Sequence, residues 1–345
     1  MRILVVRLSS LGDVVHAVPA VAGLRRTFPD ARIDWLVDDR YRELVDLVAA
    51  VDRRIGVPRT RRLTRLPRLV RGLREARYDV ALDLQGLLKS ALLARSAGAR
   101  RLIGLERAHL RERPAGWLYS ETPRLGDPVH VIERNLALVA CLGVRARPFE
   151  FPLADRSSAV VREARDALGA DRARPFALIN PGAAWASKRW PPARFGALAR
   201  GLARTCGLRS VVLWGPGERA LAERVVDAAA GAAAPAPATT VGRLVALARA
   251  AAVVVSGDTG PLHVAAAVGA PTVGIYGPSD PRRNGPWSPR DIVVSPRQPC
   301  RCRLRRAGST GVVVRRCVEA RPCLASIPVE DVAGAVARRL AANDA

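Results

Sequence analysis

A single acidic side chain, Asp13, follows the first strand that the sequence predicts. The β-branched run Ile3–Val6 predicts a buried strand, and apolar residues at helical spacing predict a helix from about Asp13. Small residues that predict a tight turn lie between them: Ser9, Ser10 and Gly12. Ligands of α/β sheets bind at the carboxyl ends of strands, so Asp13 is placed to accept a proton from a substrate. Aspartate also caps helix N-termini, which leaves a purely structural role open.

The segment Val253–His263 (VVVSGDTGPLH) has the features of an anion site. A buried strand ends in small residues that let backbone N–H groups approach a ligand, and Pro261 is favourable at the first position of a helix. His263 is placed to donate to a phosphate oxygen. Asp258 is itself anionic, so we expect it to cap backbone or to bind sugar hydroxyls. A structural turn capped by Asp258 or Thr259 is the alternative.

Two further strand-to-loop corners carry polar residues. In Asn180–Trp190 (NPGAAWASKRW), Lys188 follows a turn and is suited to neutralise charge on a leaving phosphate, unless it is only part of a solvated basic pair. Leu213–Glu218 (LWGPGE) is suited to hold a nucleoside, although the motif alone is weak. These corners predict a diphosphate-binding site in the second half of the chain.

The first half contains polar residues suited to an acceptor pocket. Asp83–Ser90 (DLQGLLKS) places Gln85 at the end of a strand and Lys89 on the next helix, and Arg111 lies in a later loop. Together with Arg7 these side chains could line such a pocket, whereas each alone is more typical of a structural or surface residue.

The elements that must position these residues alternate between strands and helices. Strands are predicted at 2–7, 32–37, 79–83, 101–104, 176–180, 210–214, 252–256 and 272–276. Helices are predicted at 13–28, 40–49, 66–76, 87–97, 130–143, 157–168, 192–205, 217–230, 240–250, 261–268 and 328–342. Residues 231–238 are predicted to form a loop, and 296–325 an irregular segment. This alternation predicts an α/β protein with parallel sheets covered by helices.

The series divides into two Rossmann-like halves, with a cleft between them for the substrate. We predict an acceptor-binding domain over residues 1–155, a nucleotide-sugar-binding domain over 172–325, and a final helical segment, 326–345, that returns toward the first domain. The 345 residues suffice for two domains of ordinary size.

The formal net charge of +25 is unusually high, and only Lys89 and Lys188 among the 56 basic residues are lysines. Such a charge attracts polyanions, including anionic membranes. The stretch Arg59–Arg77 has Leu66, Leu69 and Leu73 at helical spacing among arginines, which suits an anionic lipid surface or an ordinary solvated helix. The sequence contains no nucleic-acid-binding motif, signal peptide or membrane span, so we expect a cytoplasmic protein without a nucleic-acid partner.

Four of the six cysteines lie in one short segment: Cys300, Cys302, Cys317 and Cys323. Their spacing does not match a standard zinc pattern, so we predict no metal, with free thiols or a loosely held metal as open alternatives. Cys141 and Cys206 are predicted to be core residues.

Several motifs in this order resemble those of the ADP-heptose:lipopolysaccharide heptosyltransferases, glycosyltransferase family nine. They are SSLGD, DLQGLLKS, NPGA…SKRW, GDTGPLH and IYGPSDP, and the resemblance covers essentially the whole chain. IDWLVDD at 33–39 and RERPAGWLY at 111–119, followed by His130, are more similar to heptosyltransferase I than to II. Arg7 stands where some members have lysine.

The resemblance implies a GT-B fold and a metal-independent, inverting transfer of L-glycero-D-manno-heptose from ADP-heptose to the Kdo of lipid A–linked inner core, with no cofactor. It implies Asp13 as the catalytic base, assisted by Lys188. Implied donor-binding residues are Asn180, Lys188, Glu218, Asp258, Thr259, Gly260 and His263. Implied acceptor-binding residues are Arg7, Ser9, Ser10, Gly12, Gln85, Lys89, Arg111 and His130. A monomer bound peripherally to the inner face of the inner membrane is the expected form.

Two rival functions remain open from the sequence. A family member that uses another nucleotide sugar or another acceptor would differ in its donor profile. A UDP-sugar epimerase of similar fold would turn over nucleotide sugar without any acceptor.

Overall fold

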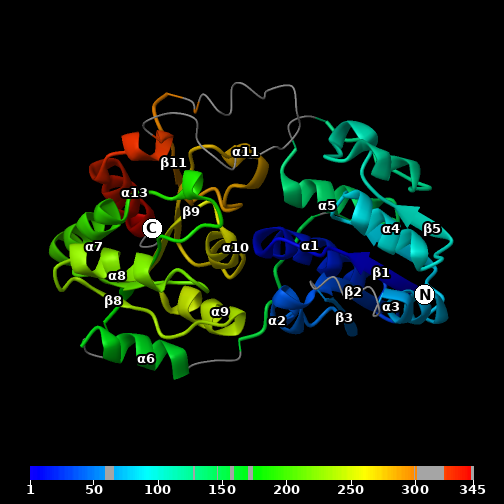
Figure 1. The fold of residues 1–345 in the computed structure, drawn as a ribbon, viewed down its shortest axis with the longest axis horizontal. Coiled ribbons are helices and arrows are strands. Elements are labelled where there is room, and N and C mark those ends of the chain that lie inside the picture. The colour runs from blue at the N-terminus through cyan, green and yellow to red at the C-terminus, as the bar shows by residue number, and fades with distance from the viewer. Residues whose placement is uncertain are drawn as a thin grey trace. The chain divides into compact units, whose positions relative to one another are not determined.

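The computed structural model describes residues 1–58, 66–126, 129–145, 147–155, 159–169, 174–298, 300 and 322–342. The chain divides into two compact units, with the change from the first to the second at Ala154–Asp155 (Figure 1). Each unit is built around its own parallel β-sheet. Across the described ranges, no helix has the length and hydrophobicity that a membrane span requires.

The first unit contains a five-stranded sheet in the order β3-β2-β1-β4-β5. Its strands are β1 (Arg2–Val6), β2 (Arg32–Asp38), β3 (Arg53–Val57), β4 (Val80–Asp83) and β5 (Arg101–Ile103). Its α-helices are α1 (Leu11–Thr27), α2 (Arg42–Asp46), α3 (Leu66–Glu75), α4 (Leu88–Ser96) and α5 (Val131–Ala140). Short 3₁₀ turns are η1 (Asp39–Tyr41), η3 (Arg107–His109) and η4 (Arg113–Trp117).

Strand β1 lies at the centre of this sheet, between β2 and β4. Its four apolar residues, Ile3–Val6, are fully buried, as expected for a parallel strand covered on both faces. The turn after β1 therefore opens at the middle of the carboxyl edge of the sheet, between the turns that follow the two neighbouring strands. Asp13 thus follows the central strand at the edge of the sheet where ligands of α/β proteins bind.

The second unit contains a six-stranded sheet in the order β11-β10-β9-β6-β7-β8. Its strands are β6 (Phe176–Asn180), β7 (Arg209–Val212), β8 (Ala233–Pro235), β9 (Val253–Gly257), β10 (Thr272–Ile275) and β11 (Ile292–Val294). Its α-helices are α6 (Ala159–Ala167), α7 (Pro192–Cys206), α8 (Arg219–Ala228), α9 (Val241–Ala250), α10 (Gly260–Ala267), α11 (Pro281–Asn284) and α13 (Val329–Ala341). The 3₁₀ turns are η5 (Ala186–Lys188) and η6 (Cys323–Ser326).

The helix α13 belongs to the second unit. Its buried residues Val332, Ala335 and Val336 join the core formed by α7 and the strands of this unit's sheet. The apolar face of α13 is thus buried within the second unit, and the expected return of segment 326–345 toward the first domain stays a prediction.

The predicted α/β class with parallel sheets is confirmed. Three strands were not predicted: β3, β8 and β11. The predicted loop 231–238 is wrong, because it contains β8, an edge strand whose end tolerates Pro235. All three strands are short and lie at sheet edges, where partial exposure removes the continuous apolar run that marks a buried strand.

Candidate functional site

The turn between β1 and α1 holds Asp13 through both of its carboxylate oxygens. Oδ1 forms an ion pair with Arg7 at 2.7 Å. Oδ2 accepts from the backbone N–H of Ser10 at 3.1 Å and from its hydroxyl at 2.9 Å. The helix begins at Leu11, two residues before the predicted start, so Ser10 is the N-cap and Asp13 lies in the first turn. The Asp13 side chain is 30% exposed, so its carboxylate is both anchored and accessible.

Arg7 is almost fully buried, and its guanidinium also donates to the backbone carbonyl of Leu84. Arg7 therefore connects the turn after β1 with the turn after β4. The indole N–H of Trp35 on β2 donates to the Arg7 carbonyl at 3.3 Å, which fixes the backbone at the same point. Arg7 is therefore a buried ion-pair partner of Asp13 and not an isolated surface cation.

A second connection between these two turns is made by Gln85. Its Oε1 accepts from the backbone N–H groups of Leu8 at 2.7 Å and Ser9 at 3.2 Å. Since an amide oxygen must face these two donors, the orientation of the side-chain amide is fixed. Its Nε2 is buried without a hydrogen-bond partner among the described residues. Gln85 thus holds the backbone that leads into Asp13.

The buried carboxylate of Asp83 organises the turn that carries Gln85. It accepts from the backbone N–H groups of Gln85 at 2.9 Å and Gly86 at 3.2 Å, and from the hydroxyls of Ser90 at 2.9 Å and Tyr119 at 2.8 Å. Burial raises the pKa of Asp83, against the lowering effect of these hydrogen bonds. Burial also raises the pKa of Tyr119, and the neighbouring Asp83 charge adds to the effect.

The other predicted acceptor residues occupy different parts of the first unit. Ser9 is half-buried, Gly12 is buried, and Lys89 and Arg111 are exposed. His130 is the N-cap of α5, where its Nδ1 accepts from the backbone N–H of Ile132 at 3.2 Å. Its ring lies edge-on to His16 of α1, with centroids 5.8 Å apart.

In the second unit, the ends of β6 and β9 are joined by a network of polar side chains. Asn180 Nδ2 lies 3.0 Å from both Ser256 Oγ and Thr259 Oγ1, and the two hydroxyls are themselves 3.0 Å apart. Asn180 also donates to the Gly182 carbonyl. This network fixes the turn before α10, whose N-cap is Thr259.

The structure brings Lys188, Asp258 and His263 together at this turn. The Lys188 ammonium forms an ion pair with Asp258 Oδ2 and lies 3.4 Å from the Asp258 carbonyl. Asp258 Oδ1 contacts His263 Nε2 at 3.1 Å and accepts from Asn284 Nδ2 at 2.7 Å. The side chain of Asp258 is only 4% exposed. Both of its oxygens contact other side chains of the chain, so Asp258 holds Lys188 and His263 together at this turn.

Two opposing effects act on the pKa of Asp258. Burial alone would raise this pKa, but the hydrogen bond with His263 and the positive charge of Lys188 outweigh burial and hold it well below its usual range. Asp258 is therefore ionised at neutral pH. The pKa of the nearby Tyr276 is raised well above its usual value by burial and by the Asp258 charge.

Glu218 lies at the N-cap of α8 and reaches two other loops. Its Oε2 accepts from the Gly215 N–H at 3.2 Å, and its Oε1 lies 3.6 Å from the Arg189 guanidinium. A Cβ atom on Gly182 would lie 2.1 Å from Glu218 Oε2, so a larger residue there would displace this carboxylate. Gly257 is similarly close to the backbone, because a Cβ there would lie 2.9 Å from the Lys188 carbonyl oxygen.

Sequence reasoning missed several members of these networks. Asn284 and Tyr276 come from the segment after β10, and Asn284 shares Asp258 with His263. The Trp185 ring lies 5.6 Å from the Lys188 ammonium. Trp185 lies three positions before Lys188 in the sequence, and this spacing of an aromatic residue and a lysine could have predicted the contact.

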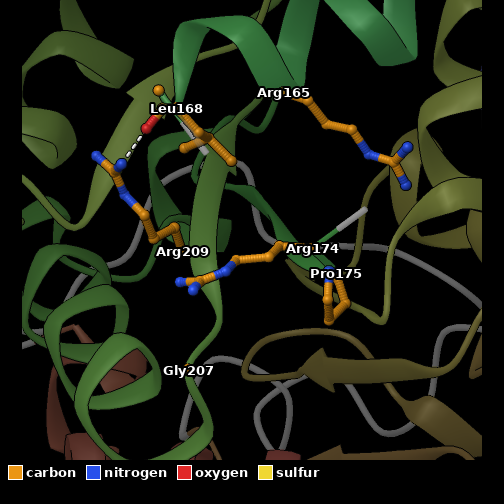
Figure 2. Close-up of a pocket in the computed structure, with 7 residues that line it drawn as sticks. Arg165, Leu168, Arg174, Pro175, Gly207 and Arg209 are labelled. Atoms are coloured by element: carbon orange, nitrogen blue, oxygen red, sulfur yellow. Dashed lines mark hydrogen bonds between the residues drawn. The ribbon is translucent and has the colours of Figure 1, made fainter. Parts of the chain in front are cut away.

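One cavity of the described chain lies away from these residues. It has a volume of about 320 Å³ and is lined in the second unit by Arg165, Leu168, Gly169, Arg174, Pro175, Gly207 and Arg209 (Figure 2). Arg209 donates to the Leu168 carbonyl across one side of this cavity. Pro175 and Gly207 precede β6 and β7, so the cavity lies at the amino end of the sheet, opposite the Asp258 network.

The predicted cysteine segment is only partly described. Cys300 is buried and Cys323 is half-buried, whereas Cys302 and Cys317 lie outside the described residues. Within the described ranges no group of three or more histidine, cysteine or acidic residues is arranged to hold a metal ion. Cys206 is exposed and Cys141 is half-buried, so the prediction that both are core residues is wrong.

The leucines of the predicted basic helix are used in packing. Residues 59–65 lie outside the described part of the chain, and α3 begins at Leu66. Leu73 is fully buried, and Leu69 packs against the core of the first unit. Of the three leucines in the described part of this helix, Leu66 alone is exposed, so most of the leucine stripe faces the protein rather than a lipid surface.

Comparison with known proteins decides the family. The sequence pattern of the family described as "Glycosyltransferase family 9 (heptosyltransferase)" matches residues 66–311. Lipopolysaccharide heptosyltransferase 1 of Pseudomonas aeruginosa is 31% identical over 311 residues, which cover 87% of this chain and 85% of that protein. The chain belongs to glycosyltransferase family 9. It is therefore a glycosyltransferase, and the resemblance inferred from the motifs is confirmed.

Other relatives agree with this assignment. Lipopolysaccharide heptosyltransferase 1 of Escherichia coli strain K12 is 28% identical over 86% of this chain and 95% of that protein. The solved structure of E. coli heptosyltransferase WaaC with ADP has a TM-score of 0.69 at 28% identity, over 85% of this chain and 92% of that chain, which confirms the expected GT-B fold. E. coli heptosyltransferase II has a TM-score of 0.79 over all of both chains, which at 24% identity shows the shared fold.

Proposed function

We propose that the chain transfers L-glycero-D-manno-heptose from ADP-heptose to the Kdo of the lipopolysaccharide inner core, with inversion at the anomeric carbon. The observation that carries this proposal is the 31% identity to a lipopolysaccharide heptosyltransferase 1 across 85% of that protein's length. Solved WaaC structures at 28% and 26% identity hold ADP and ADP-2-deoxy-2-fluoro heptose, which supports ADP-heptose as the donor.

In the proposed reaction, an acceptor hydroxyl attacks the anomeric carbon from the face opposite the diphosphate. The new carbon–oxygen bond forms as the bond to the phosphate oxygen breaks, and ADP leaves with that electron pair. Asp13 takes the proton of the attacking hydroxyl. The hydroxyl becomes strongly acidic as its bond to carbon forms, so an ordinary carboxylate is a sufficient base late in the step. The contacts with Arg7 and Ser10 hold the Asp13 carboxylate in position for this transfer.

The second unit supplies the proposed donor site. Lys188 and His263 stabilise negative charge on the diphosphate, and the N–H groups at the start of α10, from Thr259 and Gly260, add a positive helix end. Asp258 keeps Lys188 and His263 in place, and Asn180 keeps Thr259 in place. Glu218 lies on the neighbouring loop, where the resemblance places the nucleoside. The proposed mechanism needs no metal or cofactor.

The first unit supplies the proposed acceptor site. Ser9, Ser10 and Gly12 form the turn beside Asp13, and Gln85 anchors that turn while its buried Nε2 lacks a partner among the described residues. Lys89, Arg111 and His130 are proposed to contact the anionic acceptor, and Arg7 positions Asp13. We further propose a cytoplasmic monomer that works at the inner face of the inner membrane, because a lipid-linked acceptor is held there.

The test is a reaction of purified protein with ADP-heptose and Kdo–lipid A, followed by mass and anomeric analysis of the product. Addition of one heptose with the anomeric configuration opposite to that of the donor is expected. Transfer from another nucleotide sugar but not from ADP-heptose would replace the proposed donor. Transfer to a heptosylated core but not to Kdo–lipid A would indicate a heptosyltransferase II reaction.

A further inference from the structure

Three large apolar side chains of the first unit are exposed on neighbouring segments. Leu88 and Leu92 of α4 are 39% and 51% exposed, and Trp117 at the end of η4 is 71% exposed. Isolated exposed apolar residues are ordinary, but adjacent ones mark an interaction surface. We call Leu88, Leu92 and Trp117 the apolar patch.

The two segments that carry the apolar patch lie against each other. Leu88 and Leu92 are one helical turn apart, so they occupy the same face of α4. Helix α4 contacts η4, and the Leu88 N–H donates to Glu112 Oε2 at 2.8 Å, immediately before η4. The patch is therefore a feature of the first unit alone.

The segments that carry the apolar patch are rich in exposed cationic side chains. The Arg107 guanidinium lies 5.1 Å from the centre of the Trp117 ring. Four further exposed basic residues lie on the same segments: Lys89, Arg95, Arg111 and Arg113. The acidic side chains of these segments are engaged, since Glu112 accepts from Leu88 N–H and Glu106 lies 3.2 Å from His109.

Exposed apolar side chains on segments rich in cations suit an anionic lipid surface, because the indole ring and the leucines enter the interface while the arginines meet phosphate headgroups. Tryptophan is favoured at that interface. The arginine-rich helix α3 cannot serve in the same way, since Leu73 is buried and Leu69 packs against the core.

We propose that the apolar patch and its basic rim are the surface by which the first unit docks on an anionic membrane. The need for a membrane follows from the proposed function, because a lipid-linked acceptor lies there. The occupant is inferred from charge complementarity, since the rim is basic and the chain carries a formal net charge of +25.

The test is sedimentation of the full chain with vesicles of phosphatidylglycerol and phosphatidylcholine, or of phosphatidylcholine alone, without any sugar substrate. Wild-type protein is expected to bind the anionic vesicles, and added salt should weaken binding. Leu92→Ser and Trp117→Ser are each expected to lower the apparent affinity about tenfold, since each removes most of a large apolar side chain from the interface. Trp117→Phe is expected to retain most of the binding.

Val293→Ser is the matched control, because Val293 is an exposed apolar residue on β11 of the second unit. It should bind vesicles as wild type does, and circular dichroism should show all variants folded. Equal binding by wild type and Leu92→Ser/Trp117→Ser would overturn the proposal. So would wild-type protein that ignores vesicles but forms a dimer that Trp117→Ser abolishes, because a second copy would then cover the patch.

Failure of the proposed function has a different signature from failure of the docking surface. Since the vesicle assay contains no nucleotide sugar, a chain that binds vesicles through the patch but transfers no heptose would overturn only the function. A patch variant that loses vesicle binding should still transfer heptose to a water-soluble, deacylated acceptor. Loss of that transfer as well would assign the patch to the acceptor site and overturn the docking proposal.

Discussion

Asp13→Asn separates the two roles that the structure gives this carboxylate. The asparagine is close in size to aspartate but carries no charge and is a very poor base. Its single oxygen can accept either from Arg7 or from the Ser10 N–H, whereas Asp13 accepts from both. The substitution therefore removes the proposed base, and it weakens the local contacts without removing all of them.

The two effects differ greatly in size. Loss of a general base lowers turnover by a factor of about 10² to 10⁴, which at about 1.4 kcal/mol per tenfold corresponds to about 3–5.5 kcal/mol in the barrier. The Arg7 side chain is only 8% exposed and the Asp13 side chain is 30% exposed. Weakening one charge-assisted contact in this setting is expected to cost about 1–2 kcal/mol of unfolding free energy.

The assay is release of ADP from ADP-heptose in the presence of acceptor, together with calorimetric binding of ADP and urea unfolding. Asp13→Asn should lose turnover, retain ADP affinity and show a small loss of stability. The matched control is Asp52→Asn. Asp52 also accepts from an arginine, Arg25 at 2.6 Å, and from a backbone N–H, Ile33 at 2.7 Å, but it lies at the start of β3, away from the carboxyl edge.

Asp52→Asn should lose a comparable amount of stability and keep its turnover. The assignment of Asp13 as the base is refuted if Asp13→Asn retains more than about a tenth of wild-type turnover. It is also refuted if Asp13→Asn and Asp52→Asn reduce turnover equally, because Asp13 would then be a structural cap.

Three further predictions concern the networks that position the site. Because the pKa of Asp258 is lower in the folded chain than its ordinary value of 3.8, its ionised form stabilises the fold above that pH, and this contribution is lost as the pH falls below it. Asp258→Asn should therefore be less stable than wild type near neutral pH, with a difference that shrinks as the pH falls from about 5 toward 2 in urea titrations; a constant difference would contradict the ion cluster. Gln85→Ala removes the acceptor of the Leu8 and Ser9 N–H groups, and should cost about 1–3 kcal/mol of unfolding free energy and lower turnover while ADP binding stays unchanged. The control is Gln298→Ala at an exposed position. Equal urea midpoints for the two variants would show that the Gln85 side chain does not stabilise the turn after β1. Gly182→Ala should displace the Glu218 carboxylate and raise the Kd of ADP about tenfold in calorimetry. Gly201→Ala, where a Cβ meets nothing within 4 Å, should bind ADP as wild type does, and an unchanged Kd for Gly182→Ala would remove Glu218 from the nucleoside site.

The sequence predicted the central strands of both sheets because they are buried on both faces. Ile3–Val6 of β1 and Val253–Gly257 of β9 form continuous runs of small and apolar residues, and the turns after them were placed correctly. Partial exposure at the sheet edges removed this signal from β3, β8 and β11.

The residue types of the candidate site were predictable, whereas their partners were not. Asp258 and Lys188 are 70 positions apart, and Arg7 and Leu84 are 77 positions apart. Such pairs are set by which strands are neighbours in the sheet, and no local pattern carries that information. For this reason Asp258 was expected to cap backbone or to bind sugar, whereas the structure shows it holding Lys188 and His263.

The leucines of α3 show a second limit. An apolar stripe on a basic helix has the same pattern whether it faces lipid or the protein core. Leu73 is buried in the core, whereas α4 and η4 expose Leu88, Leu92 and Trp117, where no periodic pattern drew attention.

The central claim, that this chain transfers heptose from ADP-heptose, is tested most directly by ADP release from wild-type protein with and without Kdo–lipid A. The account predicts release that requires the acceptor and matches the heptose added to it. ADP-heptose that stays intact in the presence of acceptor, with another nucleotide sugar consumed instead, would contradict it.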